Sequence, residues 1–423
     1  MKIRNITLTD DQETALKRFT QFLTNKSEKY IIIQGAAGTG KSTLIEFLVH
    51  ALEVQFEMYA LLLRTNKKRS DFQVQLTATT NKAAAVLTEL TGLSAQTIHA
   101  FLGLKVSNNV STGTVKLTKK KDWNLIFNTL LIIDESSMIN DQLLAYIEET
   151  CQDCKIVFIG DKYQLAPVRQ VVPIMDKLNC PKAELNKVMR HSGPILHTSA
   201  IFREVVETLK WKNVPNLPEL QQLDGKTFQN EVNNAFLNKE SAKILAWTNK
   251  KVLAYNAYIR DLLGYPAAIQ PGEYMFTNNP IMLGSYHLPT DSGVLITDVG
   301  PLTSSHDVPG NMVQINHKVE SFMPVSQTAA KQCLNRIAKE AKKNKSKWSL
   351  FFELKNTWLD LRPSYSSTVH KAQGATYDTV FMDLADIGRC NIATDVARMM
   401  YVGISRAAKQ VYFYGDLPPK YKE

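Results

Sequence analysis

Residues 30–42 decide the fold class of this chain, and they read Tyr30-Ile-Ile-Ile-Gln-Gly-Ala-Ala-Gly-Thr-Gly-Lys-Ser42. An apolar run typical of a β-strand leads into the pattern G-x-x-x-x-G-K-[ST], and a helical pattern follows from Lys41 to Glu53. In this context the glycines let backbone N–H groups surround phosphates, and the helix N-terminus adds a favourable dipole. An ordinary glycine-rich turn between a strand and a helix is the alternative, which the flanking strand makes the weaker one. The stretch therefore predicts a nucleotide-binding P-loop.

The P-loop indicates which residues hold the nucleotide. Lys41 is expected to neutralise the β- and γ-phosphates, and Ser42 is expected to give its hydroxyl to Mg²⁺. The residues expected to bind the nucleotide are those of the motif and the one that follows it: Gly35, Ala36, Ala37, Gly38, Thr39, Gly40, Lys41, Ser42 and Thr43.

A second apolar run, Leu130–Asp134, ends in the acidic pair Asp134-Glu135. The carboxyl end of such a strand is expected to lie beside the P-loop. Asp134 would hold Mg²⁺ through water, and Glu135 would act as the general base. An acidic pair in a solvated turn at the end of a strand is the alternative, which the presence of a P-loop makes the weaker one.

Apolar runs like these alternate with helical patterns along the chain, which predicts an α/β fold. The runs are continuous, as in strands of a parallel sheet that helices cover on both faces. They lie at residues 30–34, 130–134, 155–159, 244–248, 379–383 and 410–414. Two such blocks are expected, one at residues 1–183 and one formed by 184–262 together with 363–423. Residues 263–362 contain many turn residues around short strands and predict a β-rich, barrel-like insertion.

Composition narrows the class of protein. The chain has 423 residues, 44% of them hydrophobic, so it can bury the cores of several domains. Lys and Arg outnumber Asp and Glu by 50 to 40, and the net charge of +10 favours a polyanionic partner. The start of the chain does not read as a signal peptide, and no run reaches the ~18 apolar residues of a membrane span. We expect a soluble, intracellular protein with free thiols, including Cys151 and Cys154, which lack the further ligands of a zinc site.

A P-loop and an acidic pair occur in kinases, GTPases, transporters and motors, so they leave the function open. Further motifs follow in a specific order: Leu8–Gln12, Thr77–Ala84, Gly160–Val168, Leu185–Arg190, Ser367–Gly374 and Tyr401–Ala407. With these motifs, nearly the whole chain resembles the superfamily 1 DNA helicases of the RecD-like, 5′-to-3′ group, in particular its bacteriophage members. The resemblance implies two RecA-like core domains, with a small pin hairpin inserted in the first and an SH3-like barrel inserted in the second.

The resemblance also assigns roles in ATP use. Gln12 would read the adenine through its donor and acceptor, although a surface glutamine in a capped N-terminal helix is an alternative. Gln164 would sense the γ-phosphate, and Gly374 would join the ATP site. Arg190 would reach the phosphates from the second core domain. Arg406 would be the arginine finger that makes hydrolysis depend on closure of the cleft, although a surface cation at a helix end is an alternative.

The same resemblance places polar residues of several loops on DNA. These candidates are Thr80, Asn81, Thr97, His99, Thr248, Asn249, Thr368 and His370. Hydroxyls, amides and backbone N–H groups at strand-to-helix turns suit phosphate contacts, although a helix cap explains Thr97 equally well. Thr79 and Asn81 stand where the family usually has proline and histidine, so a stacking or ring-packing role of that proline and histidine is not expected here. Trp247 would stack on bases, but a tryptophan in a strand is more often part of a core.

Two segments are expected to act near the duplex. Residues 105–121 predict the pin-like hairpin, with a polar turn near Thr112 and three lysines, Lys119–Lys121, that would grip duplex DNA or form a solvated turn. Residues 331–347 carry seven Lys and Arg against one acid, Glu340, and predict a basic amphipathic helix. This helix would contact the displaced strand or a partner protein, or it would form a solvated face.

The resemblance implies an ATP-dependent DNA helicase that uses Mg²⁺ and moves 5′ to 3′ on single-stranded DNA. It would act as a monomer on single-stranded, duplex and forked DNA, away from membranes, with a single-strand-binding or replication protein as a further partner. The setting would be phage replication or recombination in a bacterial cytoplasm. The alternatives are a single-strand-stimulated ATPase that displaces proteins with little unwinding, and a P-loop regulatory protein that only binds nucleotide. RNA as the natural strand stays open, because no residue identifies a 2′-hydroxyl contact.

Overall fold

The computed structural model describes the chain at residues 2–3, 6–63, 73–109, 114–120, 122–165, 174–189, 193–266, 268–284, 286–290 and 292–422. The chain divides into two compact units. The first unit comprises Met1–Leu104, Lys119–Asp224 and Val369–Glu423, and the second comprises Lys105–Thr118 and Gly225–Thr368. These limits differ from the boundaries expected near residues 183, 262 and 362, so the expected domain organisation stays a prediction.

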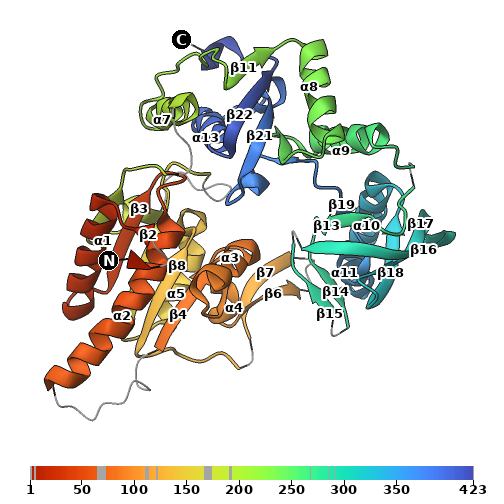
Figure 1. The fold of residues 1–423 in the computed structure, drawn as a ribbon. Helices are drawn as coiled ribbons and strands as arrows, with labels where there is room; N and C mark the ends of the chain where they lie inside the picture. The colour runs from red at the N-terminus through yellow and green to blue at the C-terminus, as the bar shows by residue number, and fades with distance from the viewer. Residues whose placement is uncertain are drawn as a thin grey trace. The chain divides into compact units, whose positions relative to one another are not determined.

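The first unit contains a six-stranded parallel sheet (Figure 1). The strand order is β10-β3-β9-β8-β4-β5. The strands are β3 (Tyr30–Gly35), β4 (Gln73–Ala78), β5 (Ala95–Thr97), β8 (Thr129–Asp134), β9 (Lys155–Gly160) and β10 (Lys182–Leu185). Every residue of β8 is buried, as is nearly all of β9. The continuous apolar runs at residues 30–34, 130–134 and 155–159 are therefore confirmed as buried parallel strands.

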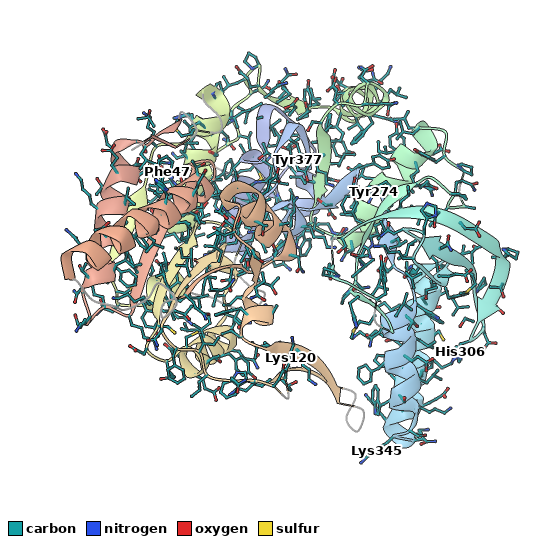
Figure 2. The ribbon with its side chains drawn as sticks, turned by 60° about the horizontal axis from the view of Figure 1, so that its bottom comes forward. Phe47, Lys120, Tyr274, His306, Lys345 and Tyr377 are labelled. Atoms are coloured by element: carbon teal, nitrogen blue, oxygen red, sulfur yellow. The ribbon has the colours of Figure 1, made fainter. Side chains whose placement is uncertain are left out.

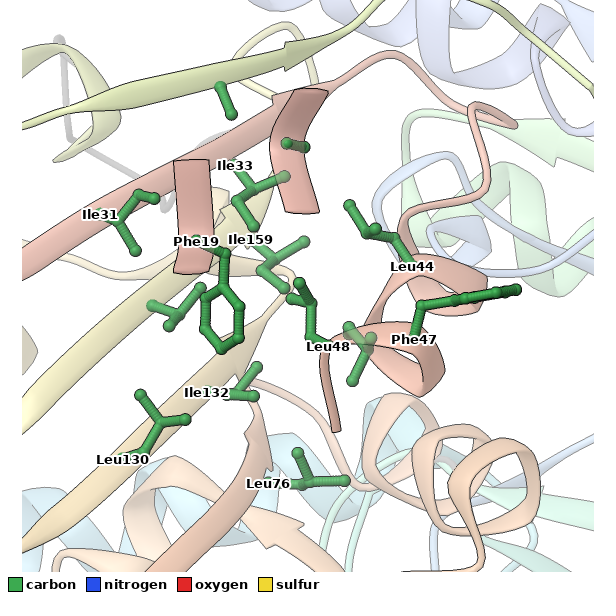
Figure 3. Close-up of a cluster of buried hydrophobic side chains, with 14 of the residues drawn as sticks. Phe19, Ile31, Ile33, Leu44, Phe47, Leu48, Leu76, Leu130, Ile132 and Ile159 are labelled. Carbon is green, nitrogen blue, oxygen red and sulfur yellow. The ribbon is translucent and has the colours of Figure 1, made fainter. Parts of the chain in front are cut away.

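Helices α1 (Asp10–Thr24) and α2 (Lys41–Leu63) bury apolar side chains against this sheet. Phe19 of α1 and Phe47 of α2 lie in one cluster with Ile33 of β3 and side chains of β4, β8 and β9 (Figure 3). The P-loop connects β3 to α2, so this core holds both ends of the loop in place. The other helices of this part of the sequence are α3 (Asn81–Thr91), α4 (Ile98–Phe101), α5 (Asp141–Thr150), α6 (Ile174–Lys177) and the 3-10 helix η2 (Ser136–Met138).

The late segment of the chain completes the first unit. Strand β22 (Ala407–Tyr414) pairs in parallel with β11 (Leu220–Leu223) and with β21 (Tyr377–Asp383). Helix α13 (Ala393–Ile404) packs on α7 (Gly193–Thr208). Short elements complete this unit: β1 (Lys2–Ile3), β2 (Ile6–Thr7), α12 (Leu384–Ile387), η3 (His370–Ala372) and η4 (Pro419–Tyr421).

An antiparallel sheet of order β18-β17-β16-β13-β19 dominates the second unit. Its strands are β13 (Tyr274–Thr277), β16 (Gly293–Ser305), β17 (Val308–Ile315), β18 (Val319–Pro324) and β19 (Leu361–Arg362). Helices α10 (Gln327–Lys343) and α11 (Lys347–Thr357) share a buried cluster with β17 and β18. Lys345, labelled in Figure 2, lies at the turn between the two helices.

The remaining elements of the second unit are short or helical. They are β6 (Leu104–Asn109), β7 (Thr114–Lys119), α8 (Gly225–Leu237), β12 (Ala242–Ala246), α9 (Asn249–Leu262), β14 (Ile281–Leu283), β15 (Tyr286–Leu288) and β20 (Ser366–Thr368). Strands β12 and β20 pair in parallel, and β14 pairs with β15 in an antiparallel manner.

The second unit modifies several expectations. The insertion is less purely β than expected, because α10 and α11 follow its strands, although α10 confirms the basic helix expected within residues 331–347. The run 244–248 is strand only as far as Ala246, because Thr248 caps α9. Strands β6 and β7 form a two-stranded sheet, and the turn expected near Thr112 lies outside the described residues. Closure of the insertion into an SH3-like barrel stays a prediction.

In the described part of the chain, no helix has the length and apolar character that crossing a membrane requires.

Candidate nucleotide and DNA sites

The carboxyl ends of the three neighbouring strands β3, β9 and β8 bring the predicted ATP-site residues to one sheet edge. Gln34 of β3 pairs with Gly160 of β9, and Ala78 of β4 pairs with Asp134 of β8. Strand β9 also pairs with β8. Since all these strands are parallel, the P-loop, the acidic pair and the Gly160–Gln164 segment lie at the same edge.

Glycines in the P-loop allow backbone conformations with positive φ, and at Gly40 a side chain would also collide with Gln12. Gly38 and Gly40 have φ values of 81° and 75°, in the left-handed region that favours glycine. A Cβ atom at Gly40 would come within 2.6 Å of Gln12 Nε2. Lys41, at the start of α2, donates through Nζ to the carbonyl oxygens of Gly35 (2.8 Å) and Ala36 (2.9 Å). The lysine therefore lies over the first part of the loop.

Gln12 is buried against the P-loop rather than exposed. Its Nε2 donates to the carbonyl oxygen of Thr39 (3.0 Å), and its Oε1 accepts from the backbone N–H of Thr9 (3.0 Å). The Thr9 hydroxyl caps helix α1 in return, which completes a capping box. The helix cap considered as an alternative thus exists, but Gln12 is not on the surface. Adenine reading stays a prediction, and it requires the amide to exchange these partners.

Asp134 and Glu135 have different environments although they are adjacent. Asp134 is buried, and burial raises the pKa of its carboxyl group to about 7. The negative charge of Glu135 raises this pKa further, while the Glu135 backbone N–H and Lys41 oppose the shift. Glu135 is only half buried and has φ 53°, an uncommon conformation for a residue with a side chain.

This donor set suits Mg²⁺. A divalent cation would relieve the repulsion between the two carboxylates, and Ser42 supplies a hydroxyl from the first turn of α2. Mg²⁺ commonly uses one or two protein oxygens together with waters and phosphate oxygens. Ser42 and Asp134 are therefore the residues that would hold the ion.

The late motifs contribute to the same edge of the first unit. Gly374 has φ 74°, and a Cβ atom placed there would lie 3.7 Å from Glu135 Oε1. Gln164 is buried, and its Nε2 donates to Asp161 Oδ2 (3.3 Å). The structure therefore brings Gly374 and Glu135 together, although they are far apart in the sequence.

Arg406 is buried, so it is not the surface cation considered as an alternative. Its guanidinium donates to the carbonyl oxygens of Val402 (3.2 Å) and Ala375 (3.3 Å) and to the Ser405 hydroxyl (3.0 Å). Burial lowers its pKa, and the nearby charge of Glu135 opposes that change. The finger role stays a prediction, and it requires these hydrogen bonds to be exchanged for phosphate oxygens.

Arg190 lies outside the described residues, but the segment before it contacts the ATP site. The Met189 backbone N–H donates to the carbonyl oxygen of Gly38 (2.7 Å). Asp11 Oδ2 accepts from the backbone N–H groups of Asn186 (2.6 Å) and Lys187 (2.9 Å). Residues 186–189 are thus held between α1 and the P-loop.

Tyr401 and Asp161 belong to motifs of the sequence but were not expected as site residues. The Tyr401 hydroxyl donates to Asp161 Oδ2 (2.6 Å) and accepts from the backbone N–H of Ala37 in the P-loop (2.8 Å). One signal was available, because a tyrosine within the apolar stretch 396–404 needs a partner for its hydroxyl. The sequence did not indicate that this partner is Asp161.

Comparisons with known proteins agree with this geometry. A family model described as an AAA domain matches residues 7–215, and one described as a UvrD-like helicase C-terminal domain matches residues 363–414. The ATP-dependent DNA helicase dda of Enterobacteria phage T4 is 24% identical over 96% of this chain and 99% of its own length. The RecBCD enzyme subunit RecD of Buchnera aphidicola is 24% identical over 91% of this chain and 70% of its own length. Over most of its length, this chain is therefore similar to superfamily 1 helicases of the RecD-like group.

Among solved structures, the Pif1 helicase from Candida albicans is similar to this helicase with a TM-score of 0.49 and 17% identity. The match covers 97% of this chain and 94% of that one.

In the first unit of this helicase, two of the candidate DNA contacts are helix caps. Thr80 caps α3 by accepting from the backbone N–H of Ala83 (3.2 Å), and Thr97 caps α4 by accepting from that of Ala100 (3.2 Å). They lie close together because Ala78 pairs with Thr97 across β4 and β5. Asn81 is exposed beside Thr80. DNA binding by these residues stays a prediction.

His99 and His370, also in the first unit, are partly buried, and burial lowers the pKa of both imidazoles. Neutral imidazoles would contact a phosphate by hydrogen bonding rather than by charge.

In the second unit of this helicase, three further candidates follow paired strands. Thr248 caps α9 by accepting from the Lys251 backbone N–H (3.3 Å), and Asn249 Oδ1 accepts from Arg362 Nη1 (3.1 Å). Thr368 ends β20, which pairs with β12 through Ala246. These residues therefore lie at one edge of the unit, and their contact with DNA stays a prediction. Trp247 is half buried, so its stacking on bases stays a prediction.

Proposed function

We propose that this chain is an ATP-dependent DNA helicase that translocates 5′ to 3′ on single-stranded DNA and unwinds duplex DNA. The observation that carries the proposal is the contact between late motifs and the P-loop site, where Gly374 lies beside Glu135 and Tyr401 contacts Ala37. A protein that only binds nucleotide has no need for such contacts. Similarity to superfamily 1 helicases supports a nucleic-acid-dependent ATPase, and the dda relative carries the name of an ATP-dependent DNA helicase. The direction rests on the resemblance to the 5′-to-3′ group.

Hydrolysis starts from the P-loop. Lys41 exchanges the carbonyl oxygens of Gly35 and Ala36 for phosphate oxygens, and the loop N–H groups surround the rest of the triphosphate. Ser42, and Asp134 through water, would hold Mg²⁺, which would supply positive charge against the phosphate oxygens. Glu135 accepts the proton of the attacking water.

Gln164, Arg190 and Arg406 connect hydrolysis to motion. Arg406 donates to the γ-phosphate after it releases the carbonyl oxygens of Val402 and Ala375, so turnover depends on movement at the end of α13. Gln164 reports loss of the γ-phosphate, and Arg190 adds positive charge near the phosphates. Gln12 selects adenine.

The motor consists of two RecA-like domains, residues 1–183 and residues 184–262 with 363–423. The β6–β7 hairpin, within residues 105–121, acts as the pin that separates the strands, and residues 263–362 form the accessory insertion. The single strand lies along the candidate contacts Thr80, Asn81, Thr97, His99, Thr248, Asn249, Thr368 and His370. Their hydroxyl, amide and imidazole groups suit phosphate oxygens.

The cellular setting is that of a phage-encoded monomer in the cytoplasm of a bacterial host, with a single-strand-binding or replication protein as its partner. The phage T4 relative supports this setting.

Strand separation tests the function directly. Matched duplexes that carry either a 5′ or a 3′ single-stranded tail are incubated with ATP and Mg²⁺, with Lys41→Ala as the inactive control. We expect unwinding of the 5′-tailed duplex alone. Unwinding from the 3′ tail alone would overturn the direction, and strand-stimulated hydrolysis without unwinding would instead favour a protein-displacing translocase.

A further inference from the structure

The Tyr401 hydroxyl lies between the P-loop and Asp161. All residues of α13 from Val396 to Ile404 are buried, and Tyr401 is 2% exposed. Its hydroxyl is both an acceptor and a donor of hydrogen bonds: it accepts from the Ala37 backbone N–H (2.8 Å) and donates to Asp161 Oδ2 (2.6 Å). A hydrogen bond to a buried carboxylate is stronger than one between neutral groups. One side chain of α13 therefore connects two loops of the parallel sheet.

Asp161 is the centre of this small network. It is 1% exposed and follows β9 directly. Its Oδ2 also accepts from Gln164 Nε2 (3.3 Å), and its Oδ1 accepts from the Tyr163 backbone N–H (3.0 Å). A buried carboxyl group is costly unless donors surround it, so the Tyr401 hydroxyl is one of the donors that satisfy the Asp161 side chain.

Burial, followed by the charge of Asp161, raises the pKa of Tyr401 well above its usual range. The phenol therefore keeps its proton and remains the donor of this pair at every working pH.

We propose that Tyr401 is a positioning residue for ATP hydrolysis. Its hydroxyl fixes the positions of three segments relative to one another: the P-loop at Ala37, the Asp161–Gln164 segment and helix α13. This inference rests on the proposed ATPase function and adds a residue that acts through others. Arg406 comes five residues after Tyr401, just beyond the end of α13. A shift of α13 that moves Arg406 must therefore also break or carry along the hydrogen bonds at Ala37 and Asp161. Gln164 shares Asp161 with Tyr401, so the γ-phosphate sensor and the finger helix are joined by a single carboxylate.

The first test compares two tyrosine variants. Tyr401→Phe keeps the buried ring and removes the hydroxyl. Tyr163→Phe is the matched control. The centres of the Tyr163 and Tyr401 rings are 6.3 Å apart, but the Tyr163 hydroxyl donates to Glu207 rather than to Asp161. We expect kcat for DNA-stimulated ATP hydrolysis to fall about tenfold in Tyr401→Phe, with KM for ATP within about twofold of wild type. The control should keep both constants within about twofold. Unchanged kcat in Tyr401→Phe would overturn the proposal.

The second test asks whether Tyr401 and Asp161 act together. If they do, Asp161→Asn combined with Tyr401→Phe should lose no more activity than the worse single variant. Multiplicative losses in kcat would contradict a shared network.

A third readout does not depend on activity. Hydrogen exchange at the Ala37 amide should be faster in Tyr401→Phe and unchanged in Tyr163→Phe. Equal exchange rates at the Ala37 amide in wild type and Tyr401→Phe would show that the Tyr401 hydroxyl does not hold the P-loop. If the wild-type chain failed to hydrolyse ATP, the proposed function would be wrong, and the exchange experiment would still decide whether Tyr401 holds the P-loop.

Discussion

Asp134 combines burial with a position beside a second carboxylate. Its surroundings favour the protonated form, because burial and the Glu135 charge outweigh the Glu135 N–H and Lys41. A cation at this point reverses that preference, since it attracts the charged carboxylate. The same aspartate is thus unfavourable when charged alone and suited to hold Mg²⁺.

This environment predicts a pH-dependent stability in EDTA. The folded pKa of about 7 lies above the ordinary value of 3.8, so Asp134 contributes stability fully below about pH 4 and loses it as the pH rises to 7. The loss should approach about 1.4 kcal/mol per pH unit within this window. Urea unfolding at pH 5.5, 6.5 and 7.5 should therefore show a steeper decline for wild type than for Asp134→Asn. Parallel curves would show that Asp134 titrates normally.

In both units, several turns between a strand and a helix contain a threonine that caps the helix. Thr80 and Thr248 follow a strand, Thr97 ends one, and each caps the next helix with its hydroxyl. In these caps the hydroxyl oxygen accepts from a backbone N–H, and a threonine hydroxyl that accepts a hydrogen bond can still donate its O–H to a phosphate oxygen. The threonine pattern is thus explained by local helix formation whether or not DNA binds there.

Lys119, the last residue of β7, also has a local role. The Lys119 ammonium pairs with Glu149 and lies 3.6 Å from the centre of the Trp123 ring. This arrangement favours a structural role for Lys119 at the base of the β6–β7 hairpin over a grip on duplex DNA. Lys121 lies outside the described residues.

The β6–β7 hairpin itself can be removed without touching the ATP site. Replacing residues 106–117 by a short Asn-Gly turn should reduce strand separation at least about tenfold and leave DNA-stimulated hydrolysis within about twofold. Both rates are measured on the same 5′-tailed duplex, so hydrolysis is the internal control. Equal loss of the two rates would contradict the pin assignment.

The net charge of +10 is unevenly distributed over the molecule. On α10, the side chains of Ala330, Ile337 and Ala341 are buried, whereas Lys339 and Lys342 are exposed. A helix with an apolar inner face and a cationic outer face suits a phosphate backbone, and no aromatic residue occurs on α10 to stack on bases. Duplex DNA is therefore a better match for this face than a single strand.

Salt dependence measures the contribution of this face. Lys339→Gln with Lys342→Gln should weaken duplex binding and lower the slope of log K against log[salt] by about one to two. Lys17→Gln with Lys26→Gln removes the same charge from exposed positions at the other end of the sequence and should leave the slope nearly unchanged. If both double variants lowered the slope equally, α10 would contribute to DNA binding only through the net charge of the protein.

The sequence by itself determined the features that depend on neighbours along the chain. The P-loop, the buried parallel strands, the strand-ending acids and the basic helix α10 follow from patterns of a few consecutive residues. The order of the short motifs was sufficient to indicate the superfamily.

Tertiary structure alone decided which distant residues meet. The contacts of Tyr401 with Ala37 and Asp161, of Gly374 with Glu135, and of Gln12 with the P-loop join residues that no local pattern relates. Their geometry depends on how helices pack on the sheet, because a hydrogen bond changes greatly over a few tenths of an ångström. The hydrogen-bond acceptors of Arg406 could not be predicted from the sequence for the same reason. A buried guanidinium needs acceptors, and packing decides which carbonyl oxygens lie within its reach.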